Sequence, residues 1–143
     1  MKSSAETYRV QDTHGKSQLD LIIQVYDGAI AAYRAAAECY RKEDYQAGYR
    51  QIEKGKNFVV HLYTTLDNDQ GGQVADNLAK LYSFIVAQTS VVEATKDLSE
   101  IDDIITVLTN LRDGWSALKQ QEVKDSAVAA EVTPSSDGFT TSG

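Results

Sequence analysis

One stretch of the chain, residues 17–40, is so apolar that it constrains the fold of everything after it. Apolar and aromatic side chains recur in it at alternating steps of three and four, at Leu19, Ile22, Tyr26, Ala29, Tyr33, Ala36 and Tyr40. This spacing places them on one stripe of an α-helix. A second apolar set lies beside that stripe, at Leu21, Val25, Ala32 and Cys39. A helix with this much apolar surface has to be covered on more than one side.

Three later segments repeat the same spacing and are expected to provide the cover. Their stripes run from Tyr45 to Leu66, from Val74 to Val92 and from Ile101 to Leu118. Each helix would be roughly 30 Å long, and the short connections place consecutive helices antiparallel. The sequence therefore predicts an all-α fold, an antiparallel up-down-up-down four-helix bundle at 17–120. A short N-terminal segment at 1–16 and a disordered C-terminal tail at 121–143 flank the bundle.

Several residues carry the signals of helix starts. Ser17 is followed three positions later by Asp20, and Ser99 by Asp102, so each serine is predicted to form a capping box. Asp44 is the expected cap of the second helix.

Gly28 lies in the middle of the first helix, where glycine costs about 1 kcal/mol relative to alanine. A close approach of a neighbouring helix would explain it, and so would a close approach of a ligand helix.

The charge balance argues against several classes of partner. The 143-residue chain has a net charge of −7, and it shows no basic patch for nucleic acid or for an anionic membrane surface. No apolar run approaches transmembrane length, and the first residues lack the apolar segment of a signal peptide. The single cysteine, Cys39, is expected to be a buried small hydrophobe. We therefore expect a cytoplasmic protein with no nucleic-acid partner and no membrane insertion.

The residue pattern argues against catalysis and cofactors. A di-metal carboxylate bundle needs glutamate three residues before histidine, but positions 11 and 58 are glutamine and phenylalanine. The loop at 67–72 faintly resembles a calcium-binding loop, yet its twelfth position is Leu78, which offers no bidentate carboxylate. No nucleophile–base spacing and no phosphate-binding glycine loop are present. We expect no enzyme activity, no metal, no cofactor and no small-molecule substrate.

Two alternatives from other functional classes follow from the residues. An exposed histidine on a bundle helix could act in phosphotransfer, which makes His61 the candidate for a histidine phosphotransfer module. Alternatively, the surplus apolar face could simply form a dimer. Phosphorylation of His61 and light scattering would distinguish these two.

The tyrosines point to a binding surface. Six of the eight lie between Tyr26 and Tyr63, and tyrosine suits surfaces that are partly apolar and partly wet. They either complete the core with hydroxyl groups at its rim, or line a groove for a helix or extended segment of a partner. Tyr8 and Val10 are the apolar residues of the N-terminal segment, which is either frayed or anchored onto such a groove.

Several motifs, in order, resemble the flagellin secretion chaperones of the FliS family. The run at 25–30, VYDGAI, resembles a leucine-tyrosine-aspartate-glycine-alanine segment in that family's first long helix. Leu66-Asp67 before Gly71-Gly72 resembles the loop between its second and third helices. The remaining matches are Asn77-Leu78 with Leu81-Tyr82, Leu111-Arg112 with Trp115, and Tyr8. The likeness covers about residues 8–118. This chain departs from the pattern at Val25, at Thr13–Ser17 and at Ala94-Thr95.

The resemblance implies a cytosolic chaperone that feeds the flagellar type III export apparatus. Such a chaperone binds the C-terminal segment of flagellin, which is disordered in the monomer, prevents its premature polymerisation and keeps it competent for export. The N-terminal segment would occupy the substrate groove until flagellin displaces it. The residues expected at the contact surface, with the core as the alternative place for each, are Tyr8, Val10, Ile22, Tyr26, Asp27, Gly28, Leu78, Leu81 and Tyr82.

Overall fold

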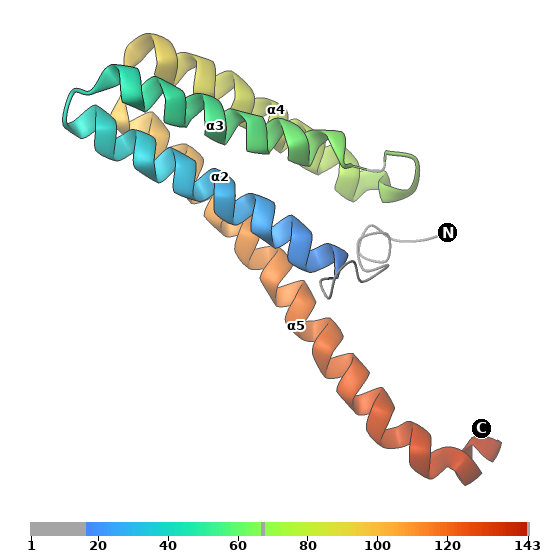
Figure 1. Cartoon of the computed structure of the whole chain (residues 1–143). Helices are drawn as coiled ribbons and strands as arrows, with labels where there is room; N and C mark the ends of the chain where they lie inside the picture. The colour runs from blue at the N-terminus through green and yellow to red at the C-terminus, as the bar shows by residue number, and fades with distance from the viewer. Residues whose placement is uncertain (1–16, 67, 143) are drawn as a thin grey trace.

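Four helices that run alternately up and down form the structure, a computed structural model (Figure 1). They are α2 (Gln18–Arg41), α3 (Tyr45–Thr64), α4 (Asn68–Thr95) and α5 (Leu98–Ser142). α2 packs against α3 and α5, α3 also packs against α4, and α4 against α5. The structure describes residues 17–66 and 68–142, and the side chains within 17–66 and 71–125. Within these ranges, the predicted all-α up-down-up-down bundle is confirmed.

The predicted stripe of the first helix is confirmed as the centre of the core. All seven of its residues are buried, and Leu19, Tyr26 and Tyr33 are completely inaccessible to solvent. α5 contributes Ile101, Ile104 and Leu108 to the same cluster. Burial of several large side chains in one cluster is the main source of stability in such a bundle.

The predicted stripe of the third helix is confirmed in part, because Leu78, Ile85 and Val92 are buried. Val74 is half exposed and Leu81 is only partly buried, whereas Ala75, Tyr82 and Thr89 lie in the core. The helix α4 also begins earlier than expected, because Asn68–Gly71 form a helical turn before a kink at Gly72. The backbone there has φ 56° and ψ −136°, a combination that only glycine adopts easily.

The helix caps agree with prediction at two of three positions. The Ser17 hydroxyl accepts a hydrogen bond from the Asp20 amide at 3.1 Å, and the Asp20 carboxylate accepts one from the Ser17 amide at 3.2 Å. Asp44 caps α3 through the Ala47 amide.

The predicted cap at Ser99 is wrong. The Asp97 carboxylate accepts from the amide of Ser99 at 2.9 Å and from its hydroxyl at 2.8 Å, and α5 begins one residue earlier, at Leu98. An aspartate in this position satisfies a free amide of the first helical turn and is as good an N-cap as serine. The same hydrogen bonds to Ser99 lower the pKa of the Asp97 carboxyl.

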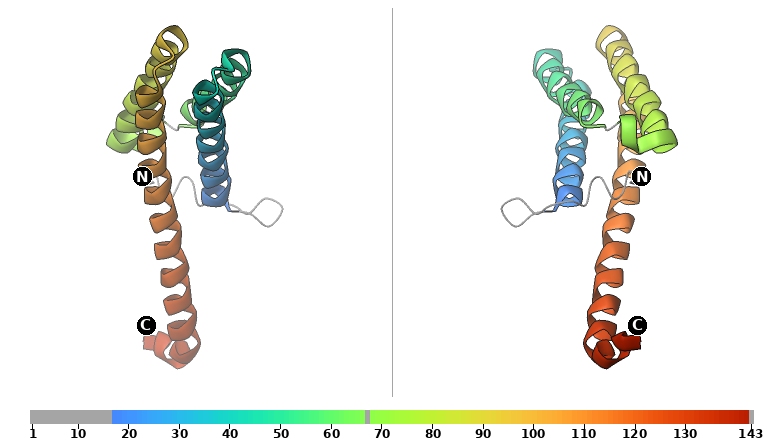
Figure 2. Two further views of the ribbon diagram at one scale, coloured as in Figure 1. Left: turned by 90° about the vertical axis from the view of Figure 1, so that its left-hand side faces the viewer. Right: turned by 90° about the vertical axis from the view of Figure 1, so that its right-hand side faces the viewer.

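The fourth helix is longer than predicted. The backbone of α5 stays helical to Ser142 and projects beyond the other three helices (Figure 2). Residues 116–125 are mostly good helix formers, such as Ala117, Lys119 and Glu122, which accounts for the continuation. A helical segment without a packing partner is marginally stable in water, so disorder of the segment at 121–143 stays a prediction.

Glycines let α2 and α3 approach closely. A Cβ atom at Gly55 of α3 would lie 2.7 Å from the Tyr33 ring of α2, and one at Gly28 of α2 would lie 2.7 Å from the Phe58 ring of α3. Each ring therefore occupies the space that a side chain would need. Close helix packing is the explanation of Gly28 that the structure supports.

Candidate binding surface

An apolar groove runs between α2 and α3. Three adjoining hollows of about 430, 490 and 130 Å³ share the side chains of Val25 and His61, which makes them one continuous depression. The two larger hollows are lined by Leu21, Gln24, Val25, Gly28, Lys54, Asn57, Phe58 and His61. We call the whole depression, with all three hollows, the α2–α3 groove. Concave, mainly apolar surfaces with a few polar groups are typical of binding sites.

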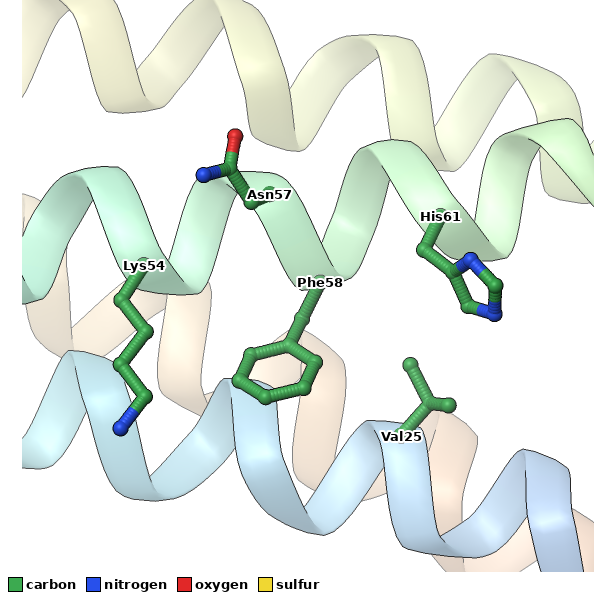
Figure 3. Close-up of a pocket in the computed structure, with 5 residues that line it drawn as sticks. All are labelled: Val25, Lys54, Asn57, Phe58 and His61. Carbon is green, nitrogen blue, oxygen red and sulfur yellow. The ribbon is translucent and has the colours of Figure 1, made fainter.

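The arrangement of the side chains shows how the groove is built. In Figure 3 the rings of Phe58 and His61 reach from α3 toward α2, and Val25 points from α2 toward them. Lys54 extends across the other end of the groove (Figure 3). The Phe58 ring lies in the space over Gly28, so it is held in place without filling the groove.

Of the predicted contact residues on α2, Gly28 and Ile22 border this groove, whereas Asp27 does not. Gly28 forms part of the floor under Phe58, and Ile22 lines the smallest hollow although it is only 7% exposed. Asp27 faces away from the groove, toward α5, where its carboxylate accepts a hydrogen bond from Arg112 Nε at 2.9 Å.

Other predicted contact residues lie in the core. Tyr26 and Tyr82 are buried, and their hydroxyl oxygens are 2.5 Å apart. The Trp115 indole N–H donates to the Tyr26 hydroxyl at 3.1 Å. Leu78 is also buried, whereas Leu81 is partly exposed. In this structure a partner could not contact Tyr26 or Tyr82 without displacing other helices.

Tyr8 and Val10, the remaining predicted residues, lie outside the described residues.

The groove contains residues that the sequence reasoning did not select. Leu21 and Val25 belong to the second apolar set of the first helix, the one left over after the core stripe was assigned. Phe58 comes from α3, where nothing in the spacing singles it out, and so does His61, which the sequence indicated only as a phosphotransfer candidate. A search for apolar residues outside the core stripe would have found the first pair.

A second apolar cleft lies on the opposite side of α3. It measures about 380 Å³ and lies between α3 and α4, lined by Val60, Tyr63, Ser83, Val86, Ala87 and Ser90. Val60 and Tyr63 are each more than 40% exposed. α3 therefore has apolar depressions on both flanks.

Neither a cluster of metal-ligating side chains nor a membrane-spanning helix is found among the described residues. No group of three or more histidine, cysteine, aspartate or glutamate side chains within 17–66 and 71–125 is placed to hold a metal ion. None of the helices in the described part is long and apolar enough to cross a membrane.

The sequence model of the family described as flagellar protein FliS matches residues 1–122. The chain belongs to the FliS family. Among its relatives, the flagellar secretion chaperone FliSB of Pseudomonas aeruginosa is 26% identical over 110 residues, which are 77% of this chain and 85% of that protein. The flagellar secretion chaperone FliS of Salmonella typhimurium is 26% identical over 99 residues, 68% of this chain and 73% of that protein.

A solved structure agrees with this FliS assignment. A crystal structure of a flagellar chaperone from bacteria matches with a TM-score of 0.70 and 25% identity, over 80% of this chain and 94% of the other. The resemblance seen in the sequence motifs is thereby confirmed, and this FliS chain is a member of a family of flagellar secretion chaperones. The comparisons offer no support for phosphotransfer at His61.

Proposed function

We propose that this chain is a cytoplasmic, non-enzymatic export chaperone that binds the disordered C-terminal segment of flagellin in the α2–α3 groove. Binding would keep that segment from polymerising and would keep flagellin competent for export by the flagellar type III apparatus. The observation that carries the proposal is a groove with apolar walls, at Leu21, Val25 and Phe58, in a chain that belongs to a family of secretion chaperones.

The groove suits a segment that folds as it binds. An amphipathic helix binds a groove through residues spaced three and four apart. Such a segment loses conformational entropy when it becomes ordered, so it needs an extended contact surface. The α2–α3 groove extends over two turns of α2, from Leu21 to Gly28, and Lys54 offers a positive charge at one end.

The N-terminal segment is the proposed internal competitor for this groove. The smallest hollow includes Gln18, so the described part of the chain begins beside the site, at Ser17. Tyr8 and Val10 would supply the apolar contacts. A variant that begins at Ser17 keeps the capping box and should bind flagellin more tightly; unchanged affinity would remove this role.

Calorimetric titration of the full chain with a peptide from the C-terminal end of flagellin tests the function. We expect binding at micromolar concentration or tighter with one peptide per chain. A scrambled peptide of the same composition is the control and should release no heat. Absence of binding by the native peptide would contradict the proposed function.

A further inference from the structure

Two glutamates face each other where α3 packs on α4. Glu53 on α3 and Glu93 on α4 interact through their side chains. Lys56 Nζ lies 3.0 Å from the Glu53 carboxylate. Glu93 Oε2 is buried without a hydrogen-bond partner. An ionised carboxylate can only accept hydrogen bonds, so two ionised carboxylates cannot form a hydrogen bond with each other.

The charges around this pair do not balance. The groups that act on Glu93 are Glu53 and Lys56 of α3, and Tyr33 and Tyr40 of α2 respond to the Glu93 charge. On α5, the Glu100 carboxylate accepts a hydrogen bond from Gln88 of α4. Lys56 is thus the one cation among the interactions described for Glu93, and it faces two carboxylates.

A proton would resolve the imbalance. A protonated Glu93 could donate a hydrogen bond to Glu53, and Lys56 would then neutralise the single remaining charge. Burial, and next the hydrogen bond with Glu53, raise the pKa of the Glu93 carboxyl to about 7. The contact with Glu93 and the ammonium of Lys56 lower the pKa of Glu53.

The pair lies along the α3–α4 interface, called the seam below, which also contains the second apolar cleft. Ser90, which lines the cleft, precedes Glu93 by three residues, or about one helical turn. We propose that Glu53 and Glu93 form a proton-sharing latch that holds α3 to α4 when it carries one proton and loosens this seam when both carboxylates are ionised. The latch is a property of the fold and does not depend on the proposed flagellin binding.

The predicted pH dependence has a definite sign. Because the folded state raises the pKa of Glu93, its proton stabilises the fold fully at low pH. This contribution is lost as the pH rises through about 7. We therefore expect the melting temperature of the full chain to fall by about 4 °C between pH 6 and pH 8. Hydrogen exchange of amides in α3 and α4 should quicken over the same range more than exchange in the α2 core.

Two variants test the latch. Glu93→Gln provides a permanent amide donor toward Glu53, and Glu53→Gln removes the opposing charge, so each should abolish most of the fall in melting temperature. The control, Asp103→Asn, changes an exposed carboxylate on α5 and should keep the fall. If the Glu93→Gln variant does not fold, the Glu53→Gln variant and a direct NMR titration of Glu93 decide. A wild-type pH profile retained in either folded variant, or a Glu93 carboxyl that titrates near 4.5, would overturn the proposal.

Discussion

Arg112 of α5 holds Asp27 of α2 in an ion pair, with Nε and Oδ1 2.9 Å apart. Lys119 and Asp20 form a second ion pair between the same helices. Asp20 and Asp27 are seven positions, or about two turns, apart on α2, and Arg112 and Lys119 are seven apart on α5 in the reverse order, as expected for antiparallel neighbours. The Trp115–Tyr26 hydrogen bond lies between them. Asp27 therefore has a structural role that its position in a family motif did not reveal.

Replacement of this aspartate should have a small effect on stability and none on binding. Both side chains of the Arg112–Asp27 pair are partly exposed, so Asp27→Asn should lower the free energy of unfolding by about 0.5 kcal/mol, less at high salt. Urea denaturation at two salt concentrations measures this. The peptide affinity of Asp27→Asn should match that of Asp103→Asn. A clear loss of affinity in Asp27→Asn alone would show that Asp27 contacts the peptide.

Glycine-to-alanine substitutions should have opposite effects at two positions. At Gly55 the new Cβ would meet the buried Tyr33 ring at 2.7 Å. We expect a net loss of about 1–2 kcal/mol, because the clash outweighs the gain in helix propensity. At Gly114 of α5 no heavy atom lies within 4 Å of the new Cβ, so Gly114→Ala should stabilise by about 0.5–1 kcal/mol. Thermal denaturation compares them; equal effects would argue against the close packing of α2 on α3.

The Tyr26 hydroxyl should matter more than its small size suggests. Tyr26→Phe removes the oxygen that connects Tyr82 and Trp115, which leaves buried polar groups with fewer partners and costs about 1–3 kcal/mol. Trp115 fluorescence should shift as its indole N–H loses an acceptor. Tyr49→Phe, at a residue 52% exposed, should change neither property. A Tyr26→Phe variant as stable as the wild type would show that this connection contributes little.

The sequence predicted the bundle well because its strongest signal, the first-helix stripe, reports burial directly. All seven residues of that stripe, which begins at Leu19 and ends at Tyr40, are in the core. It predicted α4 less well, because a polar residue, Thr89, occupies a core position. The Thr89 hydroxyl accepts a hydrogen bond from the Tyr33 hydroxyl at 2.7 Å and donates one to the Ile85 carbonyl. A polar residue satisfied in this way does not fit a purely apolar pattern.

The contact surface was harder to predict than the fold. Motif residues such as Tyr26 and Tyr82 lie in the core, where they form a hydrogen bond with each other. The α2–α3 groove, in contrast, is formed mainly by residues outside the stripes. Phe58 has no periodic signature, because its place depends on the tertiary pairing with Gly28. Spacing within one helix cannot show which pair of helices leaves a depression between them.

One comparison tests the central claim most directly. Val25 lines all three hollows of the groove, whereas Val123 of α5 is 62% exposed outside it. The two valine-to-aspartate variants should be titrated with the flagellin C-terminal peptide after their melting curves show them folded. We predict that Val25→Asp weakens affinity at least about tenfold, or ~1.4 kcal/mol, and that Val123→Asp stays within about twofold of wild type. Equal affinity of Val25→Asp and wild type would contradict binding in the α2–α3 groove.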